Sequence, residues 1–407
     1  MSQPNVSRFM EQLLDGVNIE WLPVKEVTKY EQPTKYLVKS TNYDDSYATP
    51  VLTAGKTFIL GYTDEIEGIN KASISPVIIF DDFTTANKWV DFDFKAKSSA
   101  MKMISSSDET KYSLKYVYFW LNTLPSELIE GDHKRQWISN YSNKLMPIPC
   151  PDNPEKSLAI QAEIVRILDA FTAMTAELTA ELNLRQQQYN HYRDQLLSFD
   201  EDEVEWKKLG ELVNDKFWIM PATPKFDENE DIPYITSKNI SGGHISFDKV
   251  KYISRQAHAD LSRNRPIICG DFLISMIGTI GEVARVKETD GDFYGQNMYL
   301  IRLNEELIHA GYFLHFFDSP KMKRHFSLVK NNSGQGYLKA NNIEDILVPV
   351  PSLEEQVRIA SILDKFDTLT TSINEGLPRE IELRQQQYEY YRDLLLSFPK
   401  PDTEVVA

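Results

Sequence analysis

The chain has 407 residues, with 60 acidic residues against 44 basic ones and a formal net charge of −16. At roughly 100–200 residues per domain, this length favours two to four domains. With 42% hydrophobic and 26% charged residues the composition is that of a globular protein, which argues against long disorder. Two cysteines exclude a disulfide framework and a four-thiolate zinc site, and a reducing cytoplasm is the simplest compartment.

Neither a leader nor a membrane span is expected. The N-terminal segment lacks a basic stretch followed by an apolar one, which is the pattern of a signal peptide. No apolar run approaches the length of about 18 residues that a spanning helix needs, so the sequence predicts a soluble chain. Because the net charge repels polyanions, any such partner must be met by a local basic patch.

The first predicted element is a globular domain over residues 1–150, with a short N-terminal helix. It is rich in Gly, Pro, Asn, Ser and Thr, and its short apolar runs at 57–60 and 76–80 are typical of β-strands. These features predict a mixed α/β domain with short strands and large loops.

A long helix is predicted over residues 151–202. Its apolar residues recur at spacings of three and four from Ile160 to Leu182, as in the seam of a coiled coil or helical bundle. About 40 helical residues extend roughly 60 Å, which is longer than a domain of this size needs. The alternative is an amphipathic helix that lies on its own domain.

A second globular domain is predicted over residues 203–351, with strands at 266–269 and 271–275. Apart from their first and last segments, the two domains show no convincing similarity in sequence. A second long helix, with a C-terminal tail, is predicted over residues 352–407. Gly376 and Pro378 lie inside it and predict a break or kink, with Pro378 near the first turn of a resumed helix.

The two halves of the chain are repeats of one unit. LRQQQYNHYRDQLLSF at 184–199 returns as LRQQQYEYYRDLLLSF at 383–398, an offset of 199 residues. Upstream, the Ile-Leu-Asp at 167–169 returns at 362–364, an offset of 195, so the second copy has four extra residues, about one helical turn. The predicted fold class is α+β: two mixed α/β domains separated by two long helices that form an antiparallel coiled coil, with a pseudo-twofold internal repeat. Two domains held a fixed distance apart suit two half-sites on a duplex.

The sequence contains no recognisable catalytic or metal-binding pattern. Its seven histidines show no paired ligand spacing, and it lacks the Asn-Pro-Pro-aromatic tetrapeptide of amino-methyltransferases. We therefore assign no catalytic residue and no metal ligand, and do not expect the chain to be an enzyme.

Local positive charge is the main functional signal. Residues 319–343 carry five Lys or Arg and no acid, residues 249–287 carry seven against three acids, and residues 85–115 carry six against four. Lys and Arg neutralise phosphates, whereas Asn, Gln and Ser also read base edges. A solvated basic loop is the alternative interpretation. The predicted DNA-binding residues are Lys88, Lys95, Lys97, Lys102, Lys238, Asn239, Lys249, Arg263, Arg265, Lys330, Asn331, Asn332, Ser333, Gln335 and Lys339.

The acids gather in the connectors at 200–205 and 227–231 and in the second helix, so the helices are not expected to bind DNA. Their repeated Gln-Gln-Gln-Tyr segments suit polar and aromatic contacts with other protein helices. Internal pairing of the two helices explains the four tyrosines equally well. The predicted docking residues are Gln187, Tyr189, Tyr192, Arg193, Gln386, Tyr388, Tyr391 and Arg392.

These motifs together resemble the specificity (S) subunit of type I restriction-modification systems over essentially the full chain. The resemblance is carried by Val-Pro-Val-Pro at 348–351, Leu-Glu-Glu-Gln at 353–356, both LRQQQY segments and the Glu-Trp at 205–206. Gly-Asp-Phe-Leu at 270–273, Gly-Gln-Asn at 295–297 and Ser-Gly-Gln at 333–335 look like the family's target-recognition domain. The first domain lacks the Gly-Asp-x-Leu pattern, and its segment at 76–84 resembles a different class of recognition domain.

The resemblance implies two target-recognition domains that each read one half of a bipartite DNA sequence, with a coiled coil that fixes the gap. Two methyltransferase (M) subunits would dock on the helices and methylate adenine, and restriction (R) subunits would cleave unmodified DNA. S-adenosylmethionine, ATP and Mg are then expected on these partners, and no cofactor on this chain. The alternative is a non-enzymatic coiled-coil adaptor that binds proteins; a nuclease or methyltransferase in its own right fails for lack of motifs.

Overall fold

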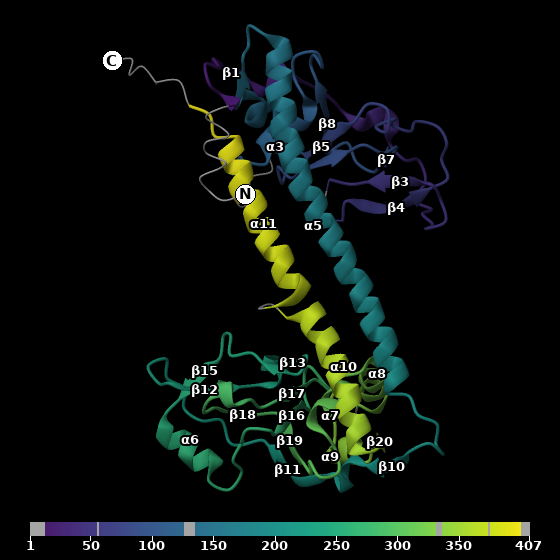
Figure 1. The fold of residues 1–407 in the computed structure, drawn as a ribbon, viewed down its shortest axis with the longest axis vertical. Helices are drawn as coiled ribbons and strands as arrows, with labels where there is room; N and C mark the ends of the chain where they lie inside the picture. Colours follow the sequence, from purple (N-terminus) through teal and green to yellow (C-terminus); the bar gives the residue numbers. More distant parts are fainter. Residues whose placement is uncertain (1–12, 55–56, 126–134, 331–335, 373–374, 400–407) are drawn as a thin grey trace. The chain divides into compact units, whose positions relative to one another are not determined.

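The structure is a computed structural model that describes residues 13–54, 57–125, 135–330, 336–372 and 375–399. The chain divides into two compact units. Unit 1 comprises residues 1–178 and 381–407, and unit 2 comprises residues 179–380. Each unit contains one globular domain and parts of the long helices (Figure 1). No helix of the described residues is long and apolar enough to cross a membrane.

Unit 1 contains an antiparallel four-stranded sheet of order β2-β8-β5-β6 and a three-stranded sheet of order β4-β3-β7. In the smaller sheet, β3 is antiparallel to β4 and parallel to β7. A separate ribbon pairs β1 with β9, the first strand of the domain with its last. The strands are β1 (Ile19–Pro23), β2 (Thr28–Glu31), β3 (Thr49–Leu52), β4 (Ile59–Thr63), β5 (Val77–Asp81), β6 (Asn87–Val90), β7 (Lys95–Ala96), β8 (Met101–Ser106) and β9 (Leu145–Pro149). The helices of this domain are α2 (Val24–Val27), η1 (Pro33–Tyr36), α3 (Leu114–Leu121), α4 (Gln136–Ser139) and η2 (Tyr141–Asn143).

The uninterrupted apolar run of β5 is explained by burial on both faces. Ile78 and Phe80 point into the core that lies against α3 and the long helices. Val77 and Ile79 point into a second core beneath the smaller sheet. Because successive side chains of a strand alternate between its faces, a strand between two cores needs apolar residues at every position. The strand predicted at 76–80 is confirmed.

Unit 2 repeats this topology. Its four-stranded sheet has the order β11-β19-β16-β17 and is antiparallel, and its three-stranded sheet has the order β15-β12-β18. Again the central strand of the smaller sheet, β12, has one antiparallel and one parallel neighbour. The strands are β10 (Glu205–Lys208), β11 (Val213–Ile219), β12 (Ile232–Ile235), β13 (Ile240–Ser241), β14 (His244–Ile245), β15 (Lys251–Ile253), β16 (Phe272–Ser275), β17 (Val283–Arg285), β18 (Tyr294–Gly295), β19 (Met298–Leu303) and β20 (Leu347–Val350). The helices of this domain are η3 (Leu209–Glu211), η4 (Ser237–Asn239), α6 (Arg255–Ser262), η5 (Glu288–Asp290), α7 (Ala310–Phe317), α8 (Pro320–Val329) and α9 (Ala340–Glu344).

The two domains share this topology although their sequences show no convincing similarity apart from their first and last segments. Strand β16 takes the place of β5: Phe272 and Ile274 enter one core and Leu273 enters the other. Packing of this kind requires apolar side chains but not the same ones, so the duplication leaves little trace in sequence.

One predicted strand is wrong. Residues 266–269 form no strand: 266–268 are irregular, and a turn at 269–270 leads into β16. In that turn the Asp271 carboxylate accepts a hydrogen bond from the backbone N–H of Ile268 at 2.8 Å, and Gly270 has a φ of +93°. A side-chain cap and a left-handed residue end a strand before it can pair.

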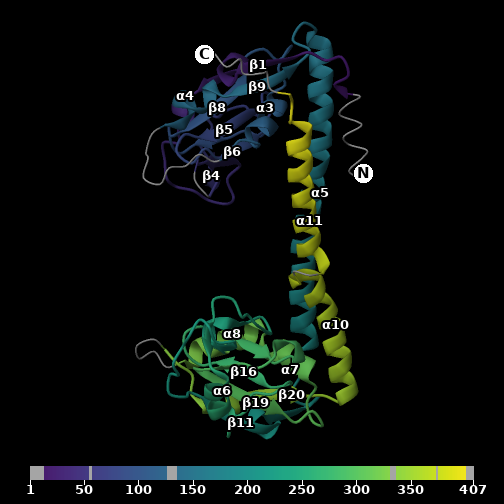
Figure 2. The ribbon, with the colours of Figure 1, turned by 90° about the vertical axis from the view of Figure 1, so that its left-hand side faces the viewer.

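The long helix α5 (Pro154–Leu196) has 43 residues and runs from unit 1 into unit 2. In unit 1 it lies beside α11 (Gly376–Leu395), where Phe171 stacks on Tyr391 at 5.1 Å between ring centroids (Figures 1 and 2). In unit 2 it lies beside α10 (Leu353–Thr371), where Tyr192 stacks on Phe366 at 5.5 Å. The earlier α5 residue, Phe171, contacts the later partner residue, and the later α5 residue, Tyr192, contacts the earlier one, so the helices pair antiparallel. The two contacts are the same contact made once in each copy of the repeat.

The predicted break in the second helix is confirmed. Helix α10 ends at Thr371, and α11 begins at Gly376 with Pro378 in its first turn. Gly376 has a φ of +79°, and a Cβ atom there would lie 2.5 Å from the carbonyl oxygen of Thr368. Only glycine fits this turn back onto the end of α10.

Candidate nucleic-acid interface and helical joint

The basic residues predicted in the first domain divide into exposed and buried ones. Lys88 and Lys97 are exposed and can reach a phosphate. Lys95 and Lys102 are 1% and 0% exposed. The prediction that Lys95 and Lys102 contact DNA is wrong, because a buried ammonium cannot reach the backbone of a duplex.

Lys95 instead joins the loops around Glu65. Its ammonium lies 2.7 Å from the Glu65 carboxylate and donates to the carbonyl of Glu67 at 2.7 Å. The same carboxylate accepts from the backbone N–H groups of Lys39 and Ser40, each at 2.8 Å. Burial acts to raise the pKa of Glu65, but Lys95 and the two amides outweigh it and lower the pKa to about 2. The Glu65–Lys95 pair therefore connects strand β7 to the loops at residues 39–40 and 65–67 and has a structural role.

Lys102 forms a fully buried ion pair with Asp82, at 3.4 Å. Asp82 also accepts a hydrogen bond from the backbone N–H of Trp137 at 2.9 Å, and the Lys102 ammonium lies 5.2 Å from the ring centroid of Tyr30. A buried charge is tolerated only when it is compensated, so each member of this pair requires the other. Asp82 belongs to the segment by which the first domain departs from the family pattern, and its role here is structural.

In unit 2 the predicted basic residues all lie on the surface, and some are already engaged. Arg263 pairs with Asp260, and Arg265 donates to the carbonyl of Trp218 at 2.8 Å. The exposed residues are Lys238, Lys249, Arg263, Arg265, Lys330 and Lys339.

The uncharged polar residues of unit 2 that were predicted to contact DNA are either engaged within the fold or not described. The amide of Asn239 accepts from the backbone N–H of Thr236 at 3.0 Å and donates to the carbonyl of Ser246 at 3.0 Å. This amide shapes a turn, so it cannot read a base without giving up those bonds. Asn331, Asn332, Ser333 and Gln335 lie outside the described residues, and their role stays a prediction.

The hairpin loop between β16 and β17 gathers two of the predicted DNA-binding segments. The Thr279 hydroxyl donates at 2.6 Å to the carbonyl of the residue before Lys238. Ile277 forms an isolated β-bridge with Tyr337, two residues before Lys339. Segments 100 residues apart in the chain therefore meet one loop and present exposed lysines beside it.

Two of the predicted docking residues are buried in the joint between α5 and the second domain. Tyr189 is 8% exposed; its hydroxyl lies 3.3 Å from Nδ1 of His315 and its ring stacks on Phe366. Arg193 is 7% exposed and lies over the Tyr189 ring at 4.9 Å. The prediction that these two side chains contact a partner protein is wrong, because they are already used inside unit 2.

The other tyrosines also serve internal pairing, which was the alternative interpretation. Tyr192 and Tyr391 stack on phenylalanines across the helix pair, and the Tyr388 ring lies 6.5 Å from that of Phe119. Tyr192 nevertheless keeps 43% of its surface exposed. Arg392 is half-buried and pairs with Asp393 at 2.7 Å. Gln187 and Gln386 are exposed and remain available for docking.

A buried glutamine fixes the joint between helix and domain in each unit, and sequence reasoning missed it. In unit 1, Gln161 accepts from the backbone N–H of Ser113 at 2.8 Å and donates to the carbonyl two residues earlier at 2.9 Å. In unit 2, Gln356 accepts from the backbone N–H of His309 at 2.7 Å and donates to the carbonyl two residues earlier at 3.2 Å. Ser113 and His309 are the N-caps of α3 and α7. The signal was present, since the two glutamines are 195 residues apart, the offset of the repeated Ile-Leu-Asp.

Comparison with known proteins gives the family. A family model described as "Type I restriction modification DNA specificity domain" matches residues 201–383. The chain is 56% identical over 406 residues to the type I restriction enzyme EcoR124I/EcoR124II specificity subunit of Escherichia coli, covering 97% of this chain and 98% of that one. This chain belongs to the family of type I restriction enzyme specificity subunits. A putative family member from Haemophilus influenzae is 31% identical over 412 residues, 97% of this chain and 99% of its own length.

The fold agrees with this membership. The crystal structure of a type I restriction-modification system S subunit from M. genitalium covers 95% of this chain and 98% of its own, with a TM-score of 0.57 and 15% sequence identity. At this identity the likeness shows the fold alone. It matches an α+β chain built of two domains and paired long helices.

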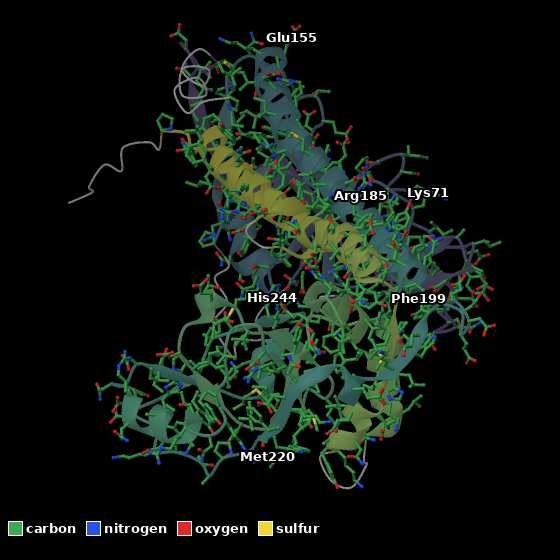
Figure 3. The ribbon with its side chains drawn as sticks, turned by 60° about the horizontal axis from the view of Figure 1, so that its bottom comes forward. Lys71, Glu155, Arg185, Phe199, Met220 and His244 are labelled. Carbon is green, nitrogen blue, oxygen red and sulfur yellow. The ribbon has the colours of Figure 1, made fainter. Side chains whose placement is uncertain are left out.

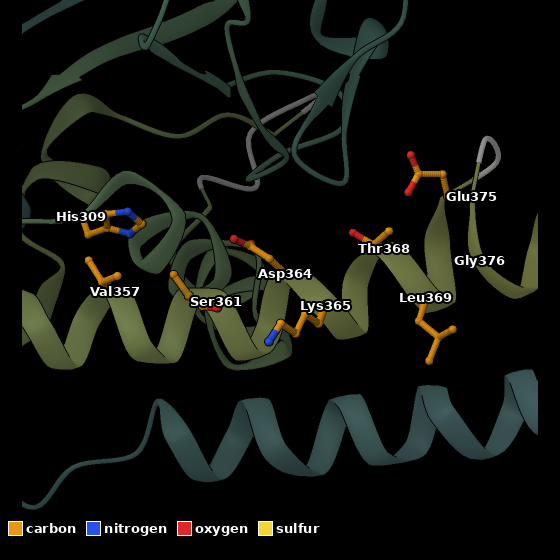
Figure 4. A pocket seen from close by; sticks show the side chains of 10 residues that line it. His309, Val357, Ser361, Asp364, Lys365, Thr368, Leu369, Glu375 and Gly376 are labelled. Atoms are coloured by element: carbon orange, nitrogen blue, oxygen red, sulfur yellow. The ribbon is translucent and has the colours of Figure 1, made fainter.

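In the present chain, a shallow groove of about 660 Å³ lies along α10 (Figure 4). Two of its polar side chains are committed to the fold. Nδ1 of His309 accepts from the backbone N–H of Tyr312 at 3.3 Å, and Asp364 lies 2.7 Å from Nε2 of His315. On α5 itself, the half-buried Arg185, labelled in Figure 3, pairs with Glu181 of the same helix at 2.7 Å. The polar groups of these helices are therefore engaged within the fold, and the helices do not present a basic surface.

Proposed function

We propose that this chain is the DNA-specificity subunit of a type I restriction-modification complex and that each globular domain reads one half of a bipartite target. The observation that carries the proposal is the duplication of one sheet topology, each copy joined in the same way to a pair of helices. Two copies of one reader with different surfaces suit a target with two different halves. The family to which the chain belongs supports this assignment.

The helices would set the gap between the half-sites and dock two methyltransferase subunits, with restriction subunits joining the assembly. The exposed Gln187 and Gln386 occupy equivalent places in the repeat, which suits two copies of one partner. S-adenosylmethionine, ATP and Mg would bind to those partners, and this chain would supply the address and no chemistry. A prokaryotic cytoplasm, where the DNA is, is the matching location.

The charge distribution bears on how the chain binds DNA. Its net charge of −16 opposes a polyanion, while its exposed lysines and arginines concentrate in the recognition domains. We therefore expect the isolated chain to bind duplex DNA weakly and the assembled complex to bind it well.

A domain exchange tests the independence of the two readers. Replacing residues 20–145 by the recognition domain of another family member should change one half of the methylated sequence and leave the other half intact. Mapping adenine methylation in a host genome gives the readout, and the unexchanged chain is the control. A change in both halves would contradict two independent readers.

The helical spacer has its own test. Adding one heptad in register to α5 and to the helix pair α10–α11 should lengthen the gap and leave both half-sites unchanged. An unaltered gap would refute the role of the helices in spacing.

A protein-binding adaptor is the alternative that methylation mapping also decides. If the chain specifies a DNA target, a split methylation motif disappears when its gene is deleted and returns with the gene. An adaptor would leave the methylation pattern unchanged.

A further inference from the structure

Helix α8 carries positive charge that the fold does not use. Ser319 caps its first turn by accepting from the backbone N–H of Met322, and Pro320 occupies the first helical position. Met322 and Phe326 form its buried face. A Cβ at Gly281, in the β16–β17 loop, would lie 2.6 Å from the Phe326 ring, so the helix is pressed against that loop.

The opposite face of α8 presents a stripe of four exposed residues, Lys321, Arg324, His325 and Leu328. Their spacing of 3, 1 and 3 places them along one side of the helix. Leu328 is 84% exposed. Within the described part of the chain, neither Lys321 nor Arg324 forms an ion pair; Arg324 donates only to the carbonyl of Pro320, at 3.3 Å.

The neighbouring lysine of the same helix behaves differently. The Lys323 ammonium lies 3.0 Å from Asp318 and 3.6 Å from Glu282. One lysine of α8 is therefore neutralised by the fold while the stripe is left free. This contrast provides a control of the same chemistry in the same helix.

The stripe forms one wall of an open groove of about 650 Å³ in unit 2. Asp194 of α5 also lines this groove, as do Leu197 and Ser198, which directly follow the helix. Apart from Asp194, the charged residues that line this groove are basic, residues 319–343 contain no acid in sequence, and the exposed Lys330 and Lys339 follow α8. An extended cationic surface with serine hydroxyls and an apolar residue is complementary to a sugar-phosphate backbone.

We propose that α8 is a DNA-contacting helix of the second recognition domain, in which Lys321 and Arg324 bind backbone phosphates and position the duplex against the β16–β17 loop. This inference rests on the proposed function and deepens it by naming the element that holds the backbone. Phosphate contacts fix register and orientation without reading sequence. The variant should therefore weaken binding to target and to random duplex alike.

The test uses the full chain assembled with its methyltransferase subunits. Binding of a target duplex and of a random duplex is measured by fluorescence anisotropy across salt concentrations for Lys321→Ala/Arg324→Ala. Each lost contact removes about 0.9 from the slope of log affinity against log salt, so the slope should fall by about 1.8. Near 0.1 M salt this corresponds to a loss of affinity on the order of 10–100-fold. Alanine preserves an exposed helix, and Lys321→Arg/Arg324→Lys should restore the slope.

Lys323→Ala is the matched control and should leave the slope unchanged, because its charge is already paired. If the unmodified complex binds the target but the double variant keeps its slope and affinity, α8 does not contact DNA and the proposed function stands. If the double variant instead loses its methyltransferase subunits on gel filtration, α8 is a protein-docking helix and the inference is overturned. If the unmodified complex shows no preference for any duplex sequence, the proposed function itself fails.

Discussion

The Glu65–Lys95 pair gives unit 1 a stability that depends on pH in a defined direction. The perturbation is Glu65→Gln, which keeps the size of the side chain and its ability to accept from the backbone N–H groups of Lys39 and Ser40. It removes the negative charge that compensates the buried ammonium of Lys95. The variant therefore leaves a buried cation without its anion, and we expect it to lower the free energy of unfolding of unit 1.

The magnitude follows from the lowered pKa of Glu65. The difference between the ordinary value of 4.5 and a pKa of about 2 corresponds to roughly 3 kcal/mol. The side chain keeps 17% of its surface exposed, and solvent screening reduces our expectation to about 2 kcal/mol at pH 7. Because the pKa is lowered by folding, this stability is fully present above about pH 4.5. It is lost as the pH falls from 4.5 towards 2, where the folded carboxylate takes up its proton.

Urea titrations between pH 7 and pH 3 measure the effect. With Trp206 and Trp218 replaced by Phe, the remaining tryptophans all lie in unit 1, so their fluorescence reports its unfolding. The difference between Glu65→Gln and the unmodified chain should shrink steadily below pH 4.5. Glu67→Gln is the control, since that side chain is 86% exposed and lies 3.9 Å from Lys39. A difference that stays constant with pH would refute the assigned role of the pair.

Three further predictions concern an exposed lysine, a buried ion pair and a buried amide. Lys97→Ala in the assembled complex should lower the salt slope of DNA binding by about 0.9 and change stability by less than about 0.5 kcal/mol; an unchanged slope would place Lys97 away from DNA. Lys102→Met should cost about 3–5 kcal/mol in urea unfolding, and adding Asp82→Asn should recover much of that loss, whereas strictly additive costs would contradict the buried pair. Gln356→Ala should cost about 2–4 kcal/mol in unit 2, because it leaves a backbone N–H and carbonyl of the α7 cap without partners. A loss below about 0.5 kcal/mol would show that the joint does not depend on this amide.

The helices were predictable from sequence because their periodicity is local. Apolar spacing of three and four predicted α5, and Gly376 with Pro378 predicted the break between α10 and α11. The repeat of the domains was not predictable. Strands β5 and β16 are equivalent because each lies between two cores. The equivalent positions hold different apolar residues, Ile78 and Phe80 in unit 1 and Phe272 and Ile274 in unit 2.

The candidate DNA-binding residues were only partly predictable, because a count of charges along the chain does not show which side chains are buried and which face solvent. Lys95 and Lys97 are two residues apart in one basic segment, yet one is buried and the other exposed. Both residues of β7, Lys95 and Ala96, are buried, so alternation along the strand does not separate the two lysines. Lys95 is buried because Glu65 and the carbonyl of Glu67 enclose its ammonium, and these partners lie about 30 residues away in sequence.

The duplicated joint explains how one chain can present two different surfaces on one frame. Each unit keeps a small set of interactions: a buried glutamine on the N-cap of a short helix, a tyrosine hydroxyl bound to a proline carbonyl and a stacked aromatic pair between the long helices. The hydroxyls of Tyr116 and Tyr312 bind the carbonyls of Pro147 and Pro349, each at 2.9 Å. These interactions fix where each domain meets its helices and require nothing of the loops at the far ends of its sheets. Loops such as those at β16–β17 and the surface of α8 can therefore change without disturbing the frame, which is the property that a pair of independent DNA readers needs.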